Sequence, residues 1–282
     1  MTTKLLALYG LKWNPFSPDV PTEALRLTPK VESFCWRVEN LVREGGFALV
    51  AGEPGVGKSV ALRLLVERLA MLREVKVALL SRPQSGVGDF YRELGDLFGV
   101  PLAPHNRWAG AKALREKWQA HIDAALMRPV LVVDEAQEMQ TAVLNELRLL
   151  GSTRLDSHIL LTTVLAGDGR LLAKLRAEDL LPLGSRVRVR LLLERASPAE
   201  LEELVRHVLA KAGAAKLMTP ELVTTLCEHA AGNPRALMTM AGEMLAAGAE
   251  REAHQLDEKL YLEVFAVPSP AVAKSAAVGR RR

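Results

Sequence analysis

Short apolar runs alternate with helical segments over the first two thirds of the chain. Each run has five to seven residues, mostly Val, Leu, Ile and Ala, and in most runs the apolar residues are successive rather than alternate. A strand that is apolar on both sides is typical of a parallel sheet covered by helices on both faces. The predicted strands are residues 47–51, 75–80, 129–133, 159–165 and 187–193. The predicted fold class is therefore α/β, with a five-stranded parallel sheet.

Apolar positions at helical spacing fill the segments between these runs. They predict helices over residues 30–44, 60–73, 89–98, 108–127 and 139–150. From Ser197 onward the pattern is helical only, and Ser197, Thr219 and Asn233 each precede a proline, as a helix N-cap does before Pro at the first helical position. A last helix is predicted over 255–265. The expected parts are an aromatic-rich N-terminal arm over 1–29, an α/β domain over 30–195, a small helical domain over 196–266 and a disordered basic tail over 267–282.

The N-terminal arm contains many turn-forming residues and three aromatic rings between residues 8 and 16. This composition predicts no regular structure there, with the rings of Tyr9, Trp13 and Phe16 buried against a domain surface. The alternative is an arm that docks onto a partner protein.

A glycine-rich segment after the first apolar run carries the main chemistry. It reads G-x-x-x-x-G-K-S between a predicted strand and a predicted helix, which is the Walker A order. Glycines allow successive backbone N–H groups to wrap a phosphate chain at a helix N-terminus. Lys58 is expected to reach the β- and γ-phosphates, and the Ser59 hydroxyl to hold Mg²⁺. The predicted ATP-binding residues here are Gly52, Glu53, Pro54, Gly55, Val56, Gly57, Lys58, Ser59 and Val60.

An acidic pair ends the third apolar run, as in a Walker B motif. Asp134 at the carboxyl end of a buried strand beside the phosphate strand is expected to hold Mg²⁺. Glu135 is expected to polarise the attacking water, a role that ATP hydrolysis needs and nucleotide binding alone does not. The six histidines and the two cysteines show no ligand spacing, so no other metal is predicted, and Cys35 and Cys227 are expected to be buried thiols.

Charge and hydropathy restrict the possible partners. The net charge of +4 equals the charge of the tail, which holds Lys274 and Arg280–Arg282 and no acid. Any affinity for nucleic acid must therefore come from local patches or from the tail. No apolar run approaches the length of a membrane span and no signal peptide is evident, so a cytoplasmic protein is expected.

Together these motifs resemble those of AAA+ ATPases over about residues 8–265. The shared features are the Walker A segment, Asp134-Glu135-Ala136-Gln137 and Gly232-Asn233-Pro234-Arg235 in the helical domain, which would form a lid. The residues 9–16 and the D-E-A-Q sequence are similar to the ExeA/TniB group. That group includes ATPase adaptors of DNA transposition related to the Mu B protein, and ATPases tied to secretion machinery.

The resemblance implies further roles. Asp168 would be the sensor-one residue, although related sequences have Gln or Asn there, and Thr163 is the other candidate. Arg186 would be an arginine finger that acts on the ATP of a neighbouring subunit in a homo-oligomeric ring or filament, unless it belongs to a basic stripe with Arg188 and Arg190. Arg235 would be the sensor-two arginine, unless its segment is only a turn and a helix start.

A DNA-binding surface is expected between the second and third strands. Its candidate residues are Arg82, Arg107, Lys112 and Arg115, with Trp108 and Trp118 interleaved. Such cations would contact the backbone of duplex DNA without sequence preference, and the resemblance implies that this region lines a DNA channel. The alternative is the solvated face of an amphipathic helix with both tryptophans on its core side.

The sequence thus favours an ATP-dependent adaptor that oligomerises on duplex DNA and recruits a transposase. The first alternative is an ExeA-like ATPase that powers assembly of a secretion or envelope machine. Such proteins usually add a membrane span and a cell-wall-binding domain, neither of which is found in these residues. A small-molecule kinase is the second alternative, although the helical domain offers no cluster of residues for an acceptor.

Overall fold

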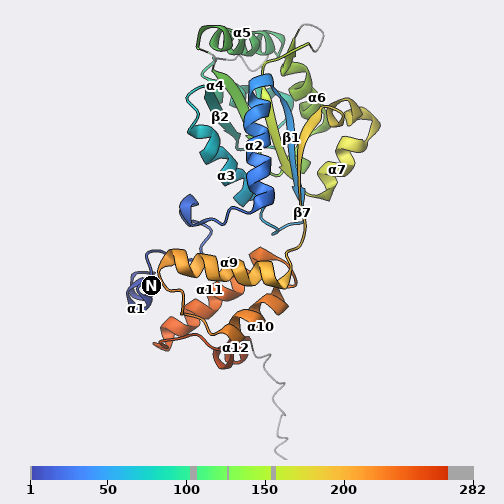
Figure 1. Ribbon diagram of the computed structural model, residues 1–282. Coiled ribbons are helices and arrows are strands. Elements are labelled where there is room, and N and C mark those ends of the chain that lie inside the picture. The colour runs from blue at the N-terminus through green and yellow to red at the C-terminus, as the bar shows by residue number, and fades with distance from the viewer. Residues whose placement is uncertain (1, 102–106, 126, 154–156, 266–282) are drawn as a thin grey trace, which may run out of the picture.

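The computed structural model describes residues 2–101, 107–125, 127–153 and 157–265. An α/β layer structure forms one end of the molecule and a group of helices forms the other (Figure 1). The predicted basic tail lies outside the described residues, as does the N-terminal methionine.

The central sheet has five parallel strands in the order β2-β3-β6-β1-β7, which confirms the predicted sheet. The strands are β1 (Gly46–Gly52), β2 (Val75–Leu80), β3 (Arg128–Val133), β6 (Thr162–Gly167) and β7 (Val187–Leu193). One expectation is wrong: the strand that ends at Asp134 does not lie beside the phosphate strand, because β6 lies between β3 and β1. All five strands still end at one edge, so the segments after β1, β3 and β6 come together there.

Two hydrophobic cores cover the two faces of the sheet. Strand residues alternate between them, since successive side chains point to opposite faces: Val130 and Val132 join one core, whereas Leu131 and Val133 join the other. The first face is covered by α2 (Pro29–Glu44) and α3 (Lys58–Ala70). The other face is covered by α4 (Val87–Phe98), α5 (Arg107–Ala125), α6 (Thr141–Leu150), α7 (Gly169–Arg176) and α8 (Leu181–Gly184).

The segment between α6 and β7 differs most from the prediction. Residues 158–159 form β5 (His158–Ile159), which pairs antiparallel with β4 (Ser152–Thr153), and the sheet strand begins only at Thr162. Helices α7 and α8 and the 3₁₀ turn between them, Glu178–Leu180, were not predicted. They have eight residues or fewer, so each contributes only a few apolar positions to the sequence pattern.

The C-terminal helices form a separate core. They are α9 (Pro198–Ala212), α10 (Pro220–Ala230), α11 (Pro234–Glu250) and α12 (Glu258–Phe265). The side chains of Ser197, Thr219 and Asn233 accept hydrogen bonds from backbone N–H groups of the first turns of α9, α10 and α11, as the sequence predicts for N-caps.

The N-terminal residues pack on this helical domain. Helix α1 (Thr2–Tyr9) contacts α11, so the expectation of no regular structure is wrong for Leu8 and Tyr9. Phe16 is buried in the helical core, and Tyr9 and Trp13 are partly buried against it. The expected burial of the rings therefore holds fully for Phe16 and in part for the other two.

Residues 18–26 then connect the two halves of the molecule. Arg63 of α3 donates to the backbone carbonyl oxygens of Pro18 and Val20, at 3.1 and 2.5 Å. Farther along the segment, the carbonyl oxygen of Ala24 lies 3.1 Å from Nε2 of His207 on α9, and Arg26 donates to the carbonyl oxygen of Glu200.

Candidate nucleotide site

The loop between β1 and α3 has the backbone of a phosphate cradle. Gly55 and Gly57 have φ angles of 88° and 104°, which side chains disfavour. Gly52 is fixed by space instead, since a Cβ there would lie 2.5 Å from the carbonyl oxygen of Leu193 on β7. Helix α3 begins at Lys58 without a side-chain cap, so the N–H groups of its first turn are open to an anion.

Lys58 is the charged group of this loop. Its side chain is buried, with 6% of the residue exposed, and Nζ donates to the carbonyl oxygens of Gly52 and Glu53 at 2.9 and 3.1 Å. Among the described residues, the hydrogen-bond partners of the ammonium group are these two neutral carbonyls. A phosphate chain in the cradle would supply the negative charge that these contacts lack.

Ser59 and Asp134 meet across the intervening strand β6. The Ser59 hydroxyl donates to Oδ2 of Asp134 at 2.8 Å, and Oδ1 of Asp134 accepts from the backbone N–H of Glu135 at 2.9 Å. A hydroxyl and a carboxylate are oxygen ligands that suit Mg²⁺, which takes only one or two protein ligands beside phosphate oxygens. The residues present therefore fit the metal that the motifs imply.

Glu135 follows in the left-handed backbone region, with φ of 52°. Its side chain is exposed at the edge of the site, and its carboxylate accepts a hydrogen bond from Nε2 of Gln137. A carboxylate that is exposed and held from one side can accept a proton from a water molecule.

The two sensor-one candidates lie at different ends of β6. Asp168 follows the strand at the carboxyl edge and caps α7 by accepting from the backbone N–H of Arg170 at 2.8 Å. Hydrogen bonding from the Arg170 side chain holds the pKa of Asp168 below its usual value, and the positive charge of Lys58 contributes to this. Thr163 pairs with Phe47 near the amino end of the sheet, away from the cradle. The structure thus brings Asp168, and not Thr163, to the nucleotide edge.

The start of α11 lies directly on the glycine loop. Nδ2 of Asn233 donates to the carbonyl oxygen of Pro54 and the backbone N–H of Arg235 donates to that of Gly55, each at 3.2 Å. The segment is a turn and a helix start, as the alternative holds, and its backbone also contacts the loop, whereas the sensor-two role of the Arg235 side chain stays a prediction. An ion pair between Arg195 and Glu53, 2.9 Å apart, adds a second link that the sequence analysis missed.

Arg186 lies at the far end of the sheet from this loop. It precedes β7, where Val187 pairs with Phe47, whereas Leu193 at the other end of β7 pairs with Gly52. Six residues of strand separate these positions, about 20 Å, so Arg186 does not reach the nucleotide site of its own chain. Arg188 pairs with Glu44, and Arg190 donates to the carbonyl oxygen of Gly184, so these two form the exposed stripe on β7.

The four candidate DNA-binding residues differ in their surroundings. Arg82 is exposed in the turn after β2, and Lys112 is exposed on α5, 3.7 Å from Glu116 and beside the ring of Trp108. Arg115 instead donates to the carbonyl oxygens of Leu149 and Leu150 at the end of α6. Arg107 begins α5, and its side chain is outside the described part of the structure.

The two tryptophans of α5 face opposite ways. Trp118 is buried, with 1% exposed, and its ring packs edge-on against Phe98. Trp108 is 75% exposed. The alternative of an amphipathic helix with both rings on the core side therefore holds only for Trp118.

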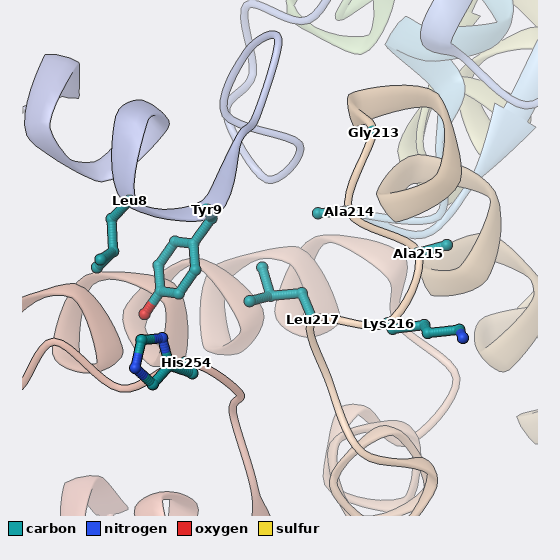
Figure 2. A pocket seen from close by; sticks show the side chains of 8 residues that line it. All are labelled: Leu8, Tyr9, Gly213, Ala214, Ala215, Lys216, Leu217 and His254. Atoms are coloured by element: carbon teal, nitrogen blue, oxygen red, sulfur yellow. The ribbon is translucent and has the colours of Figure 1, made fainter.

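A hollow in the surface lies apart from the nucleotide loop, between α1 and residues 213–217. Figure 2 shows the Tyr9 side chain pointing toward His254 across this hollow, with Leu217 and Lys216 along its wall.

Within the described ranges, no group of three or more His, Cys, Asp or Glu residues is arranged to hold a metal, and no helix combines the length and apolarity of a membrane span.

Comparison with known proteins agrees with this geometry. A sequence model of the AAA domain matches residues 42–175. General secretion pathway protein A of Aeromonas hydrophila is 31% identical over 253 residues, which are 88% of this chain and 45% of that protein. The chain thus spans less than half the length of this curated relative.

Two solved structures illustrate the likeness in fold. Cdc6p of Pyrobaculum aerophilum superposes with a TM-score of 0.71 at 16% identity, over 90% of this chain and 72% of that one. The RuvB Holliday junction branch migration motor of Thermotoga maritima gives 0.59 at 16% identity, over 89% and 72%. Together with the glycine loop and the Ser59–Asp134 contact, these matches identify the chain as an ATPase with the AAA+ fold.

Proposed function

We propose that this ATPase powers assembly of a secretion or envelope machine, the alternative that the sequence analysis left open. The observation that carries the proposal is the 31% identity to general secretion pathway protein A of Aeromonas hydrophila over 88% of this chain. The absence of a membrane span and a cell-wall-binding domain from these residues no longer counts against it, because the chain corresponds to only 45% of that relative.

In this proposal the chain's own residues divide the work of hydrolysis. Lys58 and the first turn of α3 bind the β- and γ-phosphates, and Ser59 and Asp134 hold Mg²⁺, which when bound neutralises charge on the phosphates. Glu135 accepts the proton of the attacking water. Asp168, paired with Arg170, would be the sensor-one residue at the carboxyl edge of the sheet, and the backbone of Arg235 joins the helical domain to the glycine loop.

The position of Arg186 supports a role in a homo-oligomer. An arginine at the opposite end of the sheet from the glycine loop can act only on the nucleotide of a neighbouring subunit. Assembly would therefore complete the active site and couple hydrolysis to the oligomeric state.

A DNA-bound adaptor for a transposase is the second candidate. It is favoured by the exposed Trp108 with Lys112 beside it, since a ring and a cation together suit a nucleic-acid surface. Two observations weaken it. Lys112 forms an ion pair with Glu116, and the Arg115 guanidinium donates to a backbone carbonyl oxygen at the end of α6. The 16% identity to the Holliday junction branch migration motor concerns the fold only.

One experiment separates the two candidates. A Glu135→Gln variant, which should keep ATP bound, is examined by sedimentation with ATP or ADP, with and without duplex DNA of random sequence. Assembly with ATP in the absence of DNA supports the secretion-type proposal. Assembly that requires both ATP and DNA would replace it with the adaptor.

A matched pair of variants tests the DNA surface directly. Lys112→Ala should leave the affinity for duplex DNA and its salt dependence unchanged if the secretion-type proposal holds. Under the adaptor hypothesis it should weaken binding and reduce the salt slope by about one. Lys259→Ala, an exposed lysine of the helical domain, is the control.

A further inference from the structure

Gln137 is buried two residues after the water-polarising glutamate. It lies in the 3₁₀ turn Ala136–Glu138 with 4% of its surface exposed. Both ends of its amide are used: Nε2 donates to the carboxylate of Glu135, and Oε1 accepts from the backbone N–H of Asp168 at 3.3 Å. One side chain thus joins the segment after β3 to the segment after β6.

The chemistry of the two partners fixes the orientation of this amide. A carboxylate only accepts hydrogen bonds, and a backbone N–H only donates. Turning the amide around would place its oxygen against the Glu135 carboxylate and its NH₂ against the Asp168 N–H, which would leave both contacts unsatisfied. Glutamine is therefore matched to this place by both its donor and its acceptor.

The surroundings hold the side chain in place. A Cβ at Gly167 would lie 2.5 Å from Oε1 of Gln137, so the end of β6 leaves room for the amide only because residue 167 is glycine. Lys174 of α7 donates to the backbone carbonyl oxygens of Gln137 and Met139. Hydrogen bonds from Lys174 therefore hold the backbone around the 3₁₀ turn against α7. The Gln137 amide adds a side-chain contact to Glu135.

We propose that Gln137 is a positioning residue for ATP hydrolysis. Its donor holds the Glu135 carboxylate in one orientation, and its acceptor ties that orientation to Asp168 at the start of α7. The glutamate then takes its working position only when the segment beside the γ-phosphate is in place. This inference rests on the proposed role of Glu135, and it makes the orientation of the Glu135 carboxylate depend on the position of Asp168.

The decisive variant is Gln137→Glu, which keeps the length and the acceptor for Asp168 but replaces the donor with a second carboxylate beside Glu135. We expect kcat to fall ~10- to 100-fold, a fraction of what a general base contributes. The dissociation constant for ATP should stay near the wild-type value, because Lys58 and the glycine loop are untouched, whereas the Tm should fall, because a second carboxylate is buried beside that of Glu135. Gln140→Glu makes the same chemical change at the exposed residue before α6 and should leave kcat unchanged.

Hydrogen exchange provides a readout other than activity. Gln137→Met removes both contacts, so the amide proton of Asp168 should exchange faster, whereas Gln137→Glu should keep it protected. Slow hydrolysis with a protected Asp168 amide would isolate the contact to Glu135 as the cause.

Other outcomes would overturn the proposal in distinguishable ways. Wild-type kcat in Gln137→Glu, with Glu135→Gln inactive, would show that Glu135 needs no donor from Gln137. Equal loss of ATP affinity and of kcat would mean that Gln137 only supports the fold of the site. Normal hydrolysis by Glu135→Gln would remove the proposed role of Glu135 and this inference with it.

Discussion

Asn233 makes two contacts that can be removed separately. Its Oδ1 accepts from the backbone N–H groups of Arg235 and Ala236, at 3.0 and 3.3 Å, and so caps α11. Its Nδ2 donates to the carbonyl oxygen of Pro54 in the glycine loop. Asn233→Ala removes both contacts, whereas Asn233→Asp keeps the cap, since Asp and Asn cap helices equally well, and removes only the donor to the loop.

The expected costs follow from the two contacts. Loss of an N-cap costs about 1 kcal/mol, and loss of a neutral hydrogen bond costs about 0.5–1.5 kcal/mol. Asn233→Ala should therefore lower the free energy of unfolding by about 2 kcal/mol and Asn233→Asp by about 1 kcal/mol. At about 2–4 °C per kcal/mol for a chain of this size, the melting temperature should fall by about 4–8 °C and 2–4 °C.

Thermal melts followed by circular dichroism measure these shifts, and ADP binding shows whether the glycine loop has changed. Thr219→Ala is the control, because Thr219 caps α10 without touching the loop. Its cost should match the difference between the two Asn233 variants. If Asn233→Asp melts like the wild type, the bond to Pro54 contributes nothing. If it melts like Asn233→Ala, the reasoning about the cap is refuted.

Three further predictions concern the charged and sulfur groups. Lys58→Ala should lower ATP affinity at least ~100-fold by calorimetry, since charged hydrogen bonds to phosphate are worth about 1.5–3 kcal/mol each; retained binding would contradict the assigned site. Arg186→Ala should slow hydrolysis ~1000-fold without changing ATP affinity, and normal turnover would remove the finger assignment. Burial raises the pKa of the Cys35 and Cys227 thiols from 9.0 to about 11, so the stability they confer is complete below pH 9 and is lost as the pH rises through 11. Urea unfolding at pH 8 and 10.5 should show this loss, and Cys35→Ala with Cys227→Ala should reduce it.

Much of the fold could be predicted because local patterns carry it. The apolar runs predicted all five strands of the sheet, and capping residues such as Ser197 marked the helix starts. The order of the strands in the sheet could not be predicted from these local patterns. The sequence shows that Asp134 ends a buried strand, but only tertiary pairing places β6 between that strand and β1.

Side-chain partners were harder to predict than elements. The sequence analysis included Gln137 in the Asp134-Glu135-Ala136-Gln137 motif but did not predict its contact with Asp168. The two residues lie 31 positions apart, and the spacing of apolar residues carries no information on such a contact. The Arg195–Glu53 pair spans an even longer separation. On α5 the spacing of the two tryptophans does not reveal that Trp108 is exposed and Trp118 is buried, because only the packing of α5 against α4 decides it.

Residues 18–26 limit how far the C-terminal helical domain can move from the α/β domain. The carbonyl oxygen of Val20 is hydrogen-bonded to the Arg63 side chain of α3, and that of Ala24 is hydrogen-bonded to the His207 ring of α9. The four residues from one anchor to the other can extend to about 13–14 Å at most. While both hydrogen bonds hold, the helical domain can move relative to α3 only within the length of this segment, so any larger separation of the two halves first requires one of these bonds to break.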